Sequence, residues 1–200
     1  MIFAVLHEVG HLIAGMLLGF KPKKMNIMPL GLYIQFHIPV EIYNKKIFKS
    51  NILSLKKLII ALAGPIVNLV LAIIFLILNI NTNLIYANIL ICIFNLIPIY
   101  PLDGGRIIKN LFKIIFGNKT TLRLTNIISN VSMIIISIIS SIAILYYKNI
   151  AIFFIAIYLW TVTINQNKRY NMRKKIYQDI EKYNKMLAQN FSENIAKIHN

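Results

Sequence analysis

The 200-residue sequence is poor in acidic residues and in cysteine, and charged residues of either sign make up only 14% of it. Hydrophobic residues account for 58%, and the mean hydropathy is +0.67. Soluble domains carry roughly 25% charged residues, so this composition excludes an ordinary soluble domain and indicates a membrane protein. The single cysteine, Cys92, excludes an intramolecular disulfide, and its place in an apolar run favours packing over redox chemistry.

The charges that are present are mostly positive. Lys and Arg number 22 against six acids, which gives a formal net charge of +16. In a soluble protein that excess would suggest nucleic-acid binding, but here the cations lie between and after apolar segments. Residues 20–57, 106–123 and 165–200 hold 21 of the 22, and these stretches share one side of the membrane if the apolar segments between them are spans. The positive-inside rule makes that side cytoplasmic, against an anionic lipid surface, and we expect no nucleic-acid partner.

Two histidines near the start of the chain, His7 and His11, are spaced for a shared metal site. Residues at i and i+4 lie on one face of a helix, so both imidazoles can reach one cation, and zinc suits them. Glu8 is left free to act as a general base on a water at the metal. The motif lies in an apolar stretch, where ionisable groups are costly and usually face a protein interior or a watered cavity. A buried histidine pair is the alternative, but it does not explain the Glu between the histidines.

A carboxylate far along the chain is a candidate third ligand. Of the six acids, only Glu8 and Asp103 adjoin apolar spans. An isolated carboxylate there is costly, whereas a dication would stabilise it and complete a His₂Asp site with an open position for water. A helix cap or an ion pair with Arg106 is the alternative role for Asp103. Asn68 is another polar residue in an apolar span, and the sequence leaves open whether it bonds between helices or positions a substrate.

The apolar segments predict an all-α polytopic membrane protein with about five transmembrane spans. The spans are expected at residues 1–20, at 58–78, from 84 into the segment 95–106, at 127–147 and at 150–164. Alternation from Leu32 to Phe36 predicts a short strand or hairpin after the first span. Lys45, Lys46 and Lys49 predict a solvated loop before the second span, and Lys148–Asn149 a tight turn.

Two further predictions concern packing and domain organisation. Gly15 and Gly19 form a small-xxx-small pair that would let another helix approach the first span. Residues 1–165 should form the membrane-embedded domain, and residues 166–200 a basic cytoplasmic tail. The tail has the helical spacing of an amphipathic surface-lying or partner-binding helix, with apolar positions at Ile176, Ile180, Tyr183 and Leu187.

Three motifs, in this order, resemble those of the site-2 proteases, which are zinc metalloproteases that cut substrates within or beside the membrane. The motifs are His7-Glu8-Val9-Gly10-His11, Gly64-Pro65-Ile66-Val67-Asn68 and Asn95…Pro98…Pro101-Leu102-Asp103-Gly104. The resemblance covers about residues 1–165. It implies one Zn²⁺ held by His7, His11 and Asp103, with Glu8 as the catalytic base and Asn68 and Asn95 as supporting residues. The implied substrate is a membrane-spanning or membrane-associated protein, and membrane regulatory partners are also expected.

The family core that this resemblance implies has six spans with the first motif on the second, so we expect that this chain lacks the first span. The compact length and the ending Pro-Leu-Asp-Gly-Gly-Arg most resemble the sporulation branch, stage IV sporulation protein FB. That branch processes a membrane-associated sigma-factor precursor on the cytoplasmic side of the bacterial cell membrane. It often carries a nucleotide-binding CBS domain, for which a tail of about 36 residues is too short.

Two other functions stay open. The first is a non-catalytic membrane scaffold or metal transporter on the same fold. A transporter should not need Glu8, and it would be expected to place further polar ligands along a path through the membrane, which the sequence does not show. The second is an inactive fragment that lacks its first span.

Overall fold

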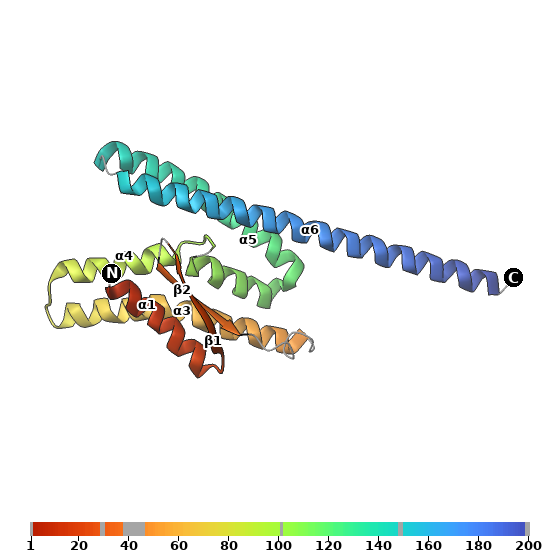
Figure 1. The fold of residues 1–200 in the computed structure, drawn as a ribbon, viewed down its shortest axis with the longest axis horizontal. Helices are drawn as coiled ribbons and strands as arrows, with labels where there is room; N and C mark the ends of the chain where they lie inside the picture. The colour runs from red at the N-terminus through yellow and green to blue at the C-terminus, as the bar shows by residue number, and fades with distance from the viewer. Residues whose placement is uncertain (1, 29–30, 38–46, 101, 148–149, 199–200) are drawn as a thin grey trace.

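The computed structural model describes residues 2–28, 31–37, 47–100, 102–147 and 150–198. Within these ranges the protein is mainly helical, with one antiparallel pair of strands. The elements are α1 (Ile2–Leu17), β1 (Lys21–Met28), β2 (Gly31–His37), α3 (Ile47–Ile77), α4 (Thr82–Leu96), α5 (Asp103–Tyr147) and α6 (Ile150–Ile198). Figure 1 shows α1, α3 and α4 grouped together, with the later part of α5 lying beside α6 as a second group.

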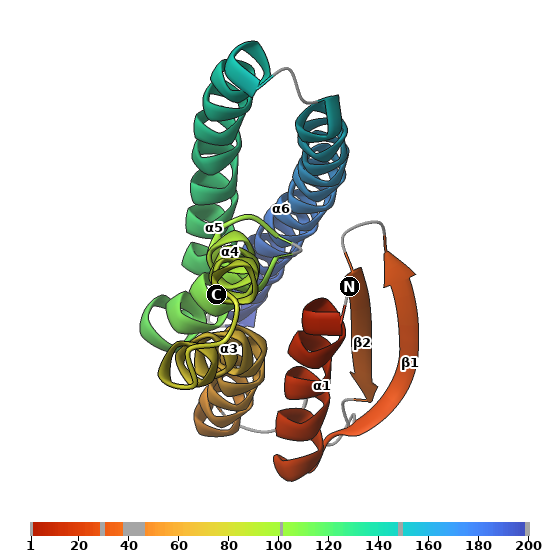
Figure 2. The same cartoon turned by 90° about the vertical axis from the view of Figure 1, so that its left-hand side faces the viewer.

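The helix α1 ends in a glycine turn that directs the chain into the strands. Gly19 has a φ of +84°, which favours glycine, and the Phe20 N–H donates to the Gly15 carbonyl at 2.9 Å, closing the last turn of the helix. The strand β1 then pairs antiparallel with β2, with Lys21 opposite His37. Figure 2 shows α1 between α3 on one side and the strand pair on the other. Both histidines of the motif are therefore buried.

Two glycines of α1 allow these neighbours to come close. A Cβ at Gly10 would lie 2.7 Å from the Val67 Cγ2 of α3, and a Cβ at Gly15 would overlap the Phe36 ring of β2. Gly19 meets nothing within 4 Å and serves the turn. The prediction that Gly15 and Gly19 admit a second helix is therefore wrong, because the helix approaches at Gly10 and a strand side chain fills the space at Gly15.

The helix α3 begins at Ile47, well before the predicted start at residue 58. The charges of Lys49, Lys56 and Lys57 mark the N-terminal boundary of the apolar span, but they do not interrupt the helix. Residues 47–63 contain no proline or glycine, so the helix continues through them. The Lys56 ammonium group donates to the Leu18 carbonyl at 3.0 Å, so it caps the neighbouring turn from within α3. Lys49 thus lies on a helix and not in a solvated loop, while Lys45 and Lys46 lie outside the described residues.

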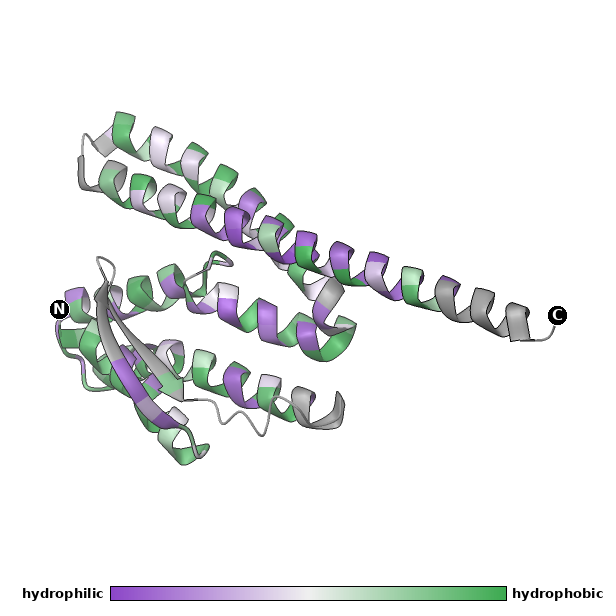
Figure 3. Ribbon diagram, turned by 45° about the vertical axis from the view of Figure 1, so that its right-hand side comes forward, coloured by the Kyte–Doolittle hydropathy of each residue, from purple (hydrophilic) through white to green (hydrophobic). Residues whose placement is uncertain are grey.

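Among the residues that the structure describes, two helices are long and apolar enough to cross a membrane, over Asn51–Ile77 and Thr120–Tyr146. The apolar helices α1 and α4 are shorter, with 16 and 15 residues. Large apolar side chains are exposed along these helices, and lipid contact would satisfy them. Figure 3 shows hydrophobic residues, in green, along the same helices. The number of five spans stays a prediction, and the predicted turn at Lys148–Asn149 lies outside the described residues.

The helix α5 has two arms, because Gly117 interrupts it with a φ of 75° and a ψ of −179°. We call residues 103–116 the first arm and 118–147 the second arm. The loop that follows α4 packs against the second arm and α6. Ile99 and Leu102 of this loop form a buried apolar core with Met133 of the second arm and Leu159 of α6. This core fixes the loop directly before Asp103. The helix α6 runs past residue 165 without interruption and extends beyond the rest of the molecule in Figure 1.

We predict that Gly117→Ala destabilises the protein by about 1–3 kcal/mol, because essentially only glycine adopts this combination of φ and ψ. Nothing lies within 4 Å of the added Cβ, so the loss would come from backbone strain and not from a clash. Thermal unfolding in detergent micelles, followed by circular dichroism, measures it. The adjacent Asn118→Ala, in an exposed helical position, is the control and should leave the midpoint nearly unchanged. Equal midpoints for the two variants would contradict the prediction.

Candidate metal centre

Three buried side chains converge from two distant parts of the chain. His7 and His11 lie one turn apart on α1, and Asp103 is the first residue of α5. The Asp103 Oδ2 lies 2.9 Å from the His7 Nε2 and 3.0 Å from the His11 Nε2. The two Nε2 atoms are 3.2 Å apart. The structure therefore brings together the three residues that the sequence predicts as ligands.

These atoms fit a small divalent cation. Bonds of about 2.0–2.1 Å in a tetrahedral zinc site separate the ligand atoms by roughly 3.3 Å, close to the distances seen here. The His11 Nδ1 lies 2.6 Å from the Ile60 carbonyl oxygen, which can only accept, so Nδ1 carries the proton and donates. In the neutral imidazole, Nε2 then holds a free lone pair directed at the carboxylate of Asp103. Lone pairs facing one another in an apolar interior are unfavourable without a cation or proton among them.

Gly64 of α3 leaves the space beside these ligand atoms open. A Cβ at this position would lie 2.6 Å from the His7 Nε2 and would overlap the imidazole of His11. Any other residue at position 64 would therefore place side-chain atoms in the space that the ligand atoms face. Gly64 is part of a motif that the sequence shares with the site-2 proteases, but this role beside the ligands is not predicted from the sequence. An isolated glycine inside an apolar helix is the signal, because it often marks a close approach.

The carboxylate of Asp103 uses both of its oxygens. While Oδ2 faces the histidines, Oδ1 accepts a hydrogen bond from the Arg106 Nη1 at 3.2 Å. From the sequence, a metal and Arg106 are alternative partners of Asp103, but the structure places Arg106 and the histidines on different oxygens. The N-terminus of α5 also favours a negative charge at this position. Arg106 therefore orients the carboxylate without taking the oxygen that faces the histidines.

Two glycines after Asp103 let the start of α5 pack tightly. A Cβ at Gly104 would overlap the Leu96 carbonyl at the end of α4, and one at Gly105 would lie 2.6 Å from the Tyr100 nitrogen. The first turn of α5 thus rests on the backbone of the loop before it. This contact places a residue 92 positions beyond His11 within hydrogen-bond distance of it.

Glu8 lies next to the ligands without being one of them. It is half-buried on α1, and its carboxylate interacts electrostatically with His7, His11 and Asp103. The atoms that converge as potential metal ligands belong to His7, His11 and Asp103 alone among the described residues. A carboxylate in this position can exchange a proton with a group at the ligand cluster.

The predicted supporting residues have different surroundings. Asn68 lies one turn beyond Gly64 on α3 and is fully buried, and neither end of its amide has a partner among the described residues. The Asn95 Nδ2 donates to the Ile91 carbonyl within α4 at 3.0 Å. Asn88, which the sequence analysis does not single out, is also fully buried, with an unpartnered Oδ1. An unpaired buried amide costs about 1–3 kcal/mol, so Asn68 is available for a ligand that can pair with it.

Apolar helices around a buried His₂Asp cluster with an adjacent glutamate are the arrangement expected of the class of membrane-embedded metalloproteases. The comparison with protein families agrees with this class. The family model for peptidase family M50 matches residues 1–85 and 78–139. The chain belongs to peptidase family M50, the family of the site-2 proteases.

A curated sequence relative and a solved structure, both from Methanocaldococcus jannaschii, are similar to the chain. A zinc metalloprotease of that organism is 32% identical over 139 residues, which cover 64% of this chain and 36% of the relative. The chain thus spans about a third of the length of that relative. The solved structure of a site-2 protease matches with a TM-score of 0.56 and 24% identity, over 82% of this chain and 74% of that chain. This match supports the fold.

We expect Asp103→Asn to lose most of the bound zinc, because an amide oxygen is a much weaker ligand than a carboxylate. Arg106→Ala should keep one zinc and weaken its affinity by about 10–100-fold, as the loss of an orienting partner does. Competitive titration against a chromogenic chelator measures both affinities. If both variants keep the zinc affinity of the wild type, Asp103 is not a ligand.

The space at Gly64 gives an independent test. Gly64→Ala should lower the zinc content to a small fraction of the wild-type value, because the methyl group would overlap the imidazole of His11. Ile66→Ala is the matched control on α3, since the Ile66 side chain is 51% exposed and should not affect the metal. Elemental analysis of both purified variants measures the zinc content. Full zinc content in Gly64→Ala would place the metal elsewhere.

Proposed function

We propose that this chain is a zinc metalloendopeptidase that cuts a membrane-embedded or membrane-associated protein near the cytoplasmic face. The observation that carries the proposal is the convergence of His7, His11 and Asp103, with Glu8 beside them, among apolar helices. Membership of peptidase family M50 supports it.

One Zn²⁺ is the cofactor that suits this ligand set. When bound, it supplies a Lewis acid that polarises a scissile carbonyl and acidifies a water molecule. His7, His11 and Asp103 would hold it, with His11 oriented by the Ile60 carbonyl. Glu8 would take the proton of the attacking water and pass it to the leaving amine, as a general base and then a general acid. Its half-buried position beside the ligands suits this exchange.

The strand pair beside α1 offers a surface for an extended substrate. In a two-stranded sheet each strand has one edge that its partner does not cover, and β1 and β2 both contact α1, the helix of the motif. An unwound substrate could add a strand there through main-chain hydrogen bonds, which read no side chains. Asn68, with both ends of its amide unpaired, could bond to the same main chain. Asn95, whose Nδ2 donates to the Ile91 carbonyl, would support the end of α4 before the loop that leads to Asp103.

The tail and the substrate are further parts of the proposal. Residues 1–165 would form the protease domain in a bacterial cell membrane, and residues 166–200 a cytoplasmic tail, as the distribution of Lys and Arg predicts. Ile176, Ile180, Tyr183 and Leu187 are 49–62% exposed on α6, which suits contact with a membrane surface or a regulatory partner. A sporulation sigma-factor precursor is the first substrate to test, because of the ending Pro-Leu-Asp-Gly-Gly-Arg.

The alternatives have less support. A transporter needs several ligand groups along its path, but within the part of the chain that the structure describes, His7, His11 and Asp103 form a single group of potential ligands. A scaffold would not require Glu8 beside a metal site. Cleavage by the wild-type chain would exclude an inactive fragment.

We predict that Glu8→Gln binds zinc normally but cleaves its substrate about 10²–10⁴-fold more slowly, because the amide cannot accept a proton. Co-expression with candidate membrane-tethered precursors, followed by immunoblotting, finds the substrate. Time courses with purified proteins then give the rates. Near-normal turnover in Glu8→Gln would contradict the proposed role of Glu8 and favour the scaffold or transporter. Equal zinc contents of the two proteins are the control.

A further inference from the structure

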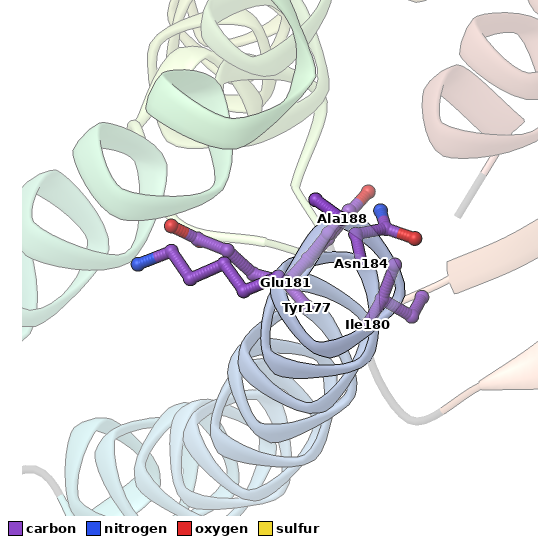
Figure 4. A pocket seen from close by; sticks show the side chains of 6 residues that line it. Tyr177, Ile180, Glu181, Asn184 and Ala188 are labelled. Carbon is purple, nitrogen blue, oxygen red and sulfur yellow. The ribbon is translucent and has the colours of Figure 1, made fainter. Parts of the chain in front are cut away.

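A second polar feature of the molecule lies away from the metal centre. A cavity of about 100 Å³ lies between the loop after α4, both arms of α5 and the middle of α6. We call it the α5–α6 cavity. A larger hollow of about 390 Å³ runs along α6 from Tyr177 to Ala188, but Figure 4 shows that its lining comes from that single helix, so it encloses no ligand. None of the three metal-site ligands lines either space.

Positive charge gathers at the α5–α6 cavity. Lys109, Arg169 and Arg173 line it, and its lining includes no acidic residue that the structure describes. Burial, together with the neighbouring charges of Arg173, Lys57 and Lys113, lowers the pKa of Lys109 to about 8. Lys109 on the first arm of α5 and Arg173 on α6 therefore repel each other, and an anion bound in the cavity would reduce this repulsion.

A buried hydroxyl completes the lining. Ser129 on the second arm of α5 is 6% exposed, and its Oγ has no hydrogen-bond partner among the described residues. A buried hydroxyl without a hydrogen-bond partner costs free energy. The Ser129 hydroxyl can donate to an oxyanion in the cavity that it lines. The neighbouring Thr125 differs, since its hydroxyl already donates to the Thr121 carbonyl at 2.6 Å.

The size and position of the cavity limit its occupant. Its volume corresponds to roughly three water molecules, which suits one phosphate group and is far below the roughly 300–1,000 Å³ of sites for larger ligands. It lies near the start of the apolar helix Thr120–Tyr146, at the level where α6 changes from apolar to basic residues. In a bilayer spanned by this helix, the cavity would lie at the depth of the lipid headgroups.

We propose that the α5–α6 cavity binds a phosphate oxyanion through Lys109, Arg169, Arg173 and the Ser129 hydroxyl. Its depth favours the headgroup of an anionic lipid over free phosphate. The proposal does not rest on the proposed peptidase activity, because neither Glu8 nor any of the three metal ligands lines the cavity. Its test needs neither zinc nor a substrate.

The test uses the full chain, purified in a neutral detergent and titrated with phosphatidylglycerol, phosphatidylcholine or inorganic phosphate. Native mass spectrometry counts the bound lipid, and the shift in thermal midpoint reports the binding of phosphate. We expect phosphatidylglycerol to bind at least tenfold more tightly than phosphatidylcholine. The double variant Arg169→Gln/Arg173→Gln should lose this preference, and Ser129→Ala should weaken the binding by a smaller factor.

Lys168→Gln is the control. It removes one positive charge from the residue before Arg169, and Lys168 does not line the cavity. It should bind phosphatidylglycerol within twofold of the wild type. If only inorganic phosphate binds, and the double variant loses it, the oxyanion site stands with a free anion as its ligand. The proposal is overturned if neither ligand binds, or if Lys168→Gln weakens binding as much as the double variant does. It is also overturned if the double variant keeps its unliganded melting midpoint and still binds normally.

Discussion

The contact on which the site depends is the approach of one carboxylate to two imidazoles in an apolar interior. The Asp103 Oδ2 lies within 3.0 Å of the Nε2 atoms of both histidines, and all three side chains are buried. Such an arrangement costs free energy unless a cation or a proton satisfies the lone pairs. The Ile60 carbonyl and Arg106 each bond to the outer side of one ligand, so they hold its inner atom toward the others. The cluster is therefore preorganised for a metal.

Glycines and one apolar core make that approach possible. Gly10 brings α1 against α3, and Gly64 keeps the space in front of the histidines clear. The loop after α4 is held by the core around Ile99 and Leu159, so the first turn of α5 begins at a fixed place. The helices thus position the ligands through close backbone contacts, as expected where lipid replaces water as the surrounding medium.

The local part of the site could be predicted from the sequence, because His7, Glu8 and His11 lie within one turn and their helical periodicity fixes their relative positions. Asp103 could be chosen by the cost of an isolated carboxylate beside an apolar span, and the family resemblance implied the same residue. The sequence could not predict that Asp103 contacts the histidines and Arg106 at the same time. Only tertiary packing decides which oxygen of the carboxylate faces which partner. The early start of α3 was missed because charge marks the end of an apolar span and not of a helix. The interruption at Gly117 was missed because a φ value is not visible in the sequence.

The proposed metal centre requires that two imidazoles and a carboxylate hold one zinc. X-ray absorption at the zinc K edge of the purified full chain tests it most directly, because multiple scattering from the rings counts the imidazoles. We predict two imidazoles and additional oxygen ligands at about 2.0–2.1 Å, without sulfur. A spectrum with one imidazole or none, or with a sulfur ligand at about 2.3 Å, would contradict the proposed centre.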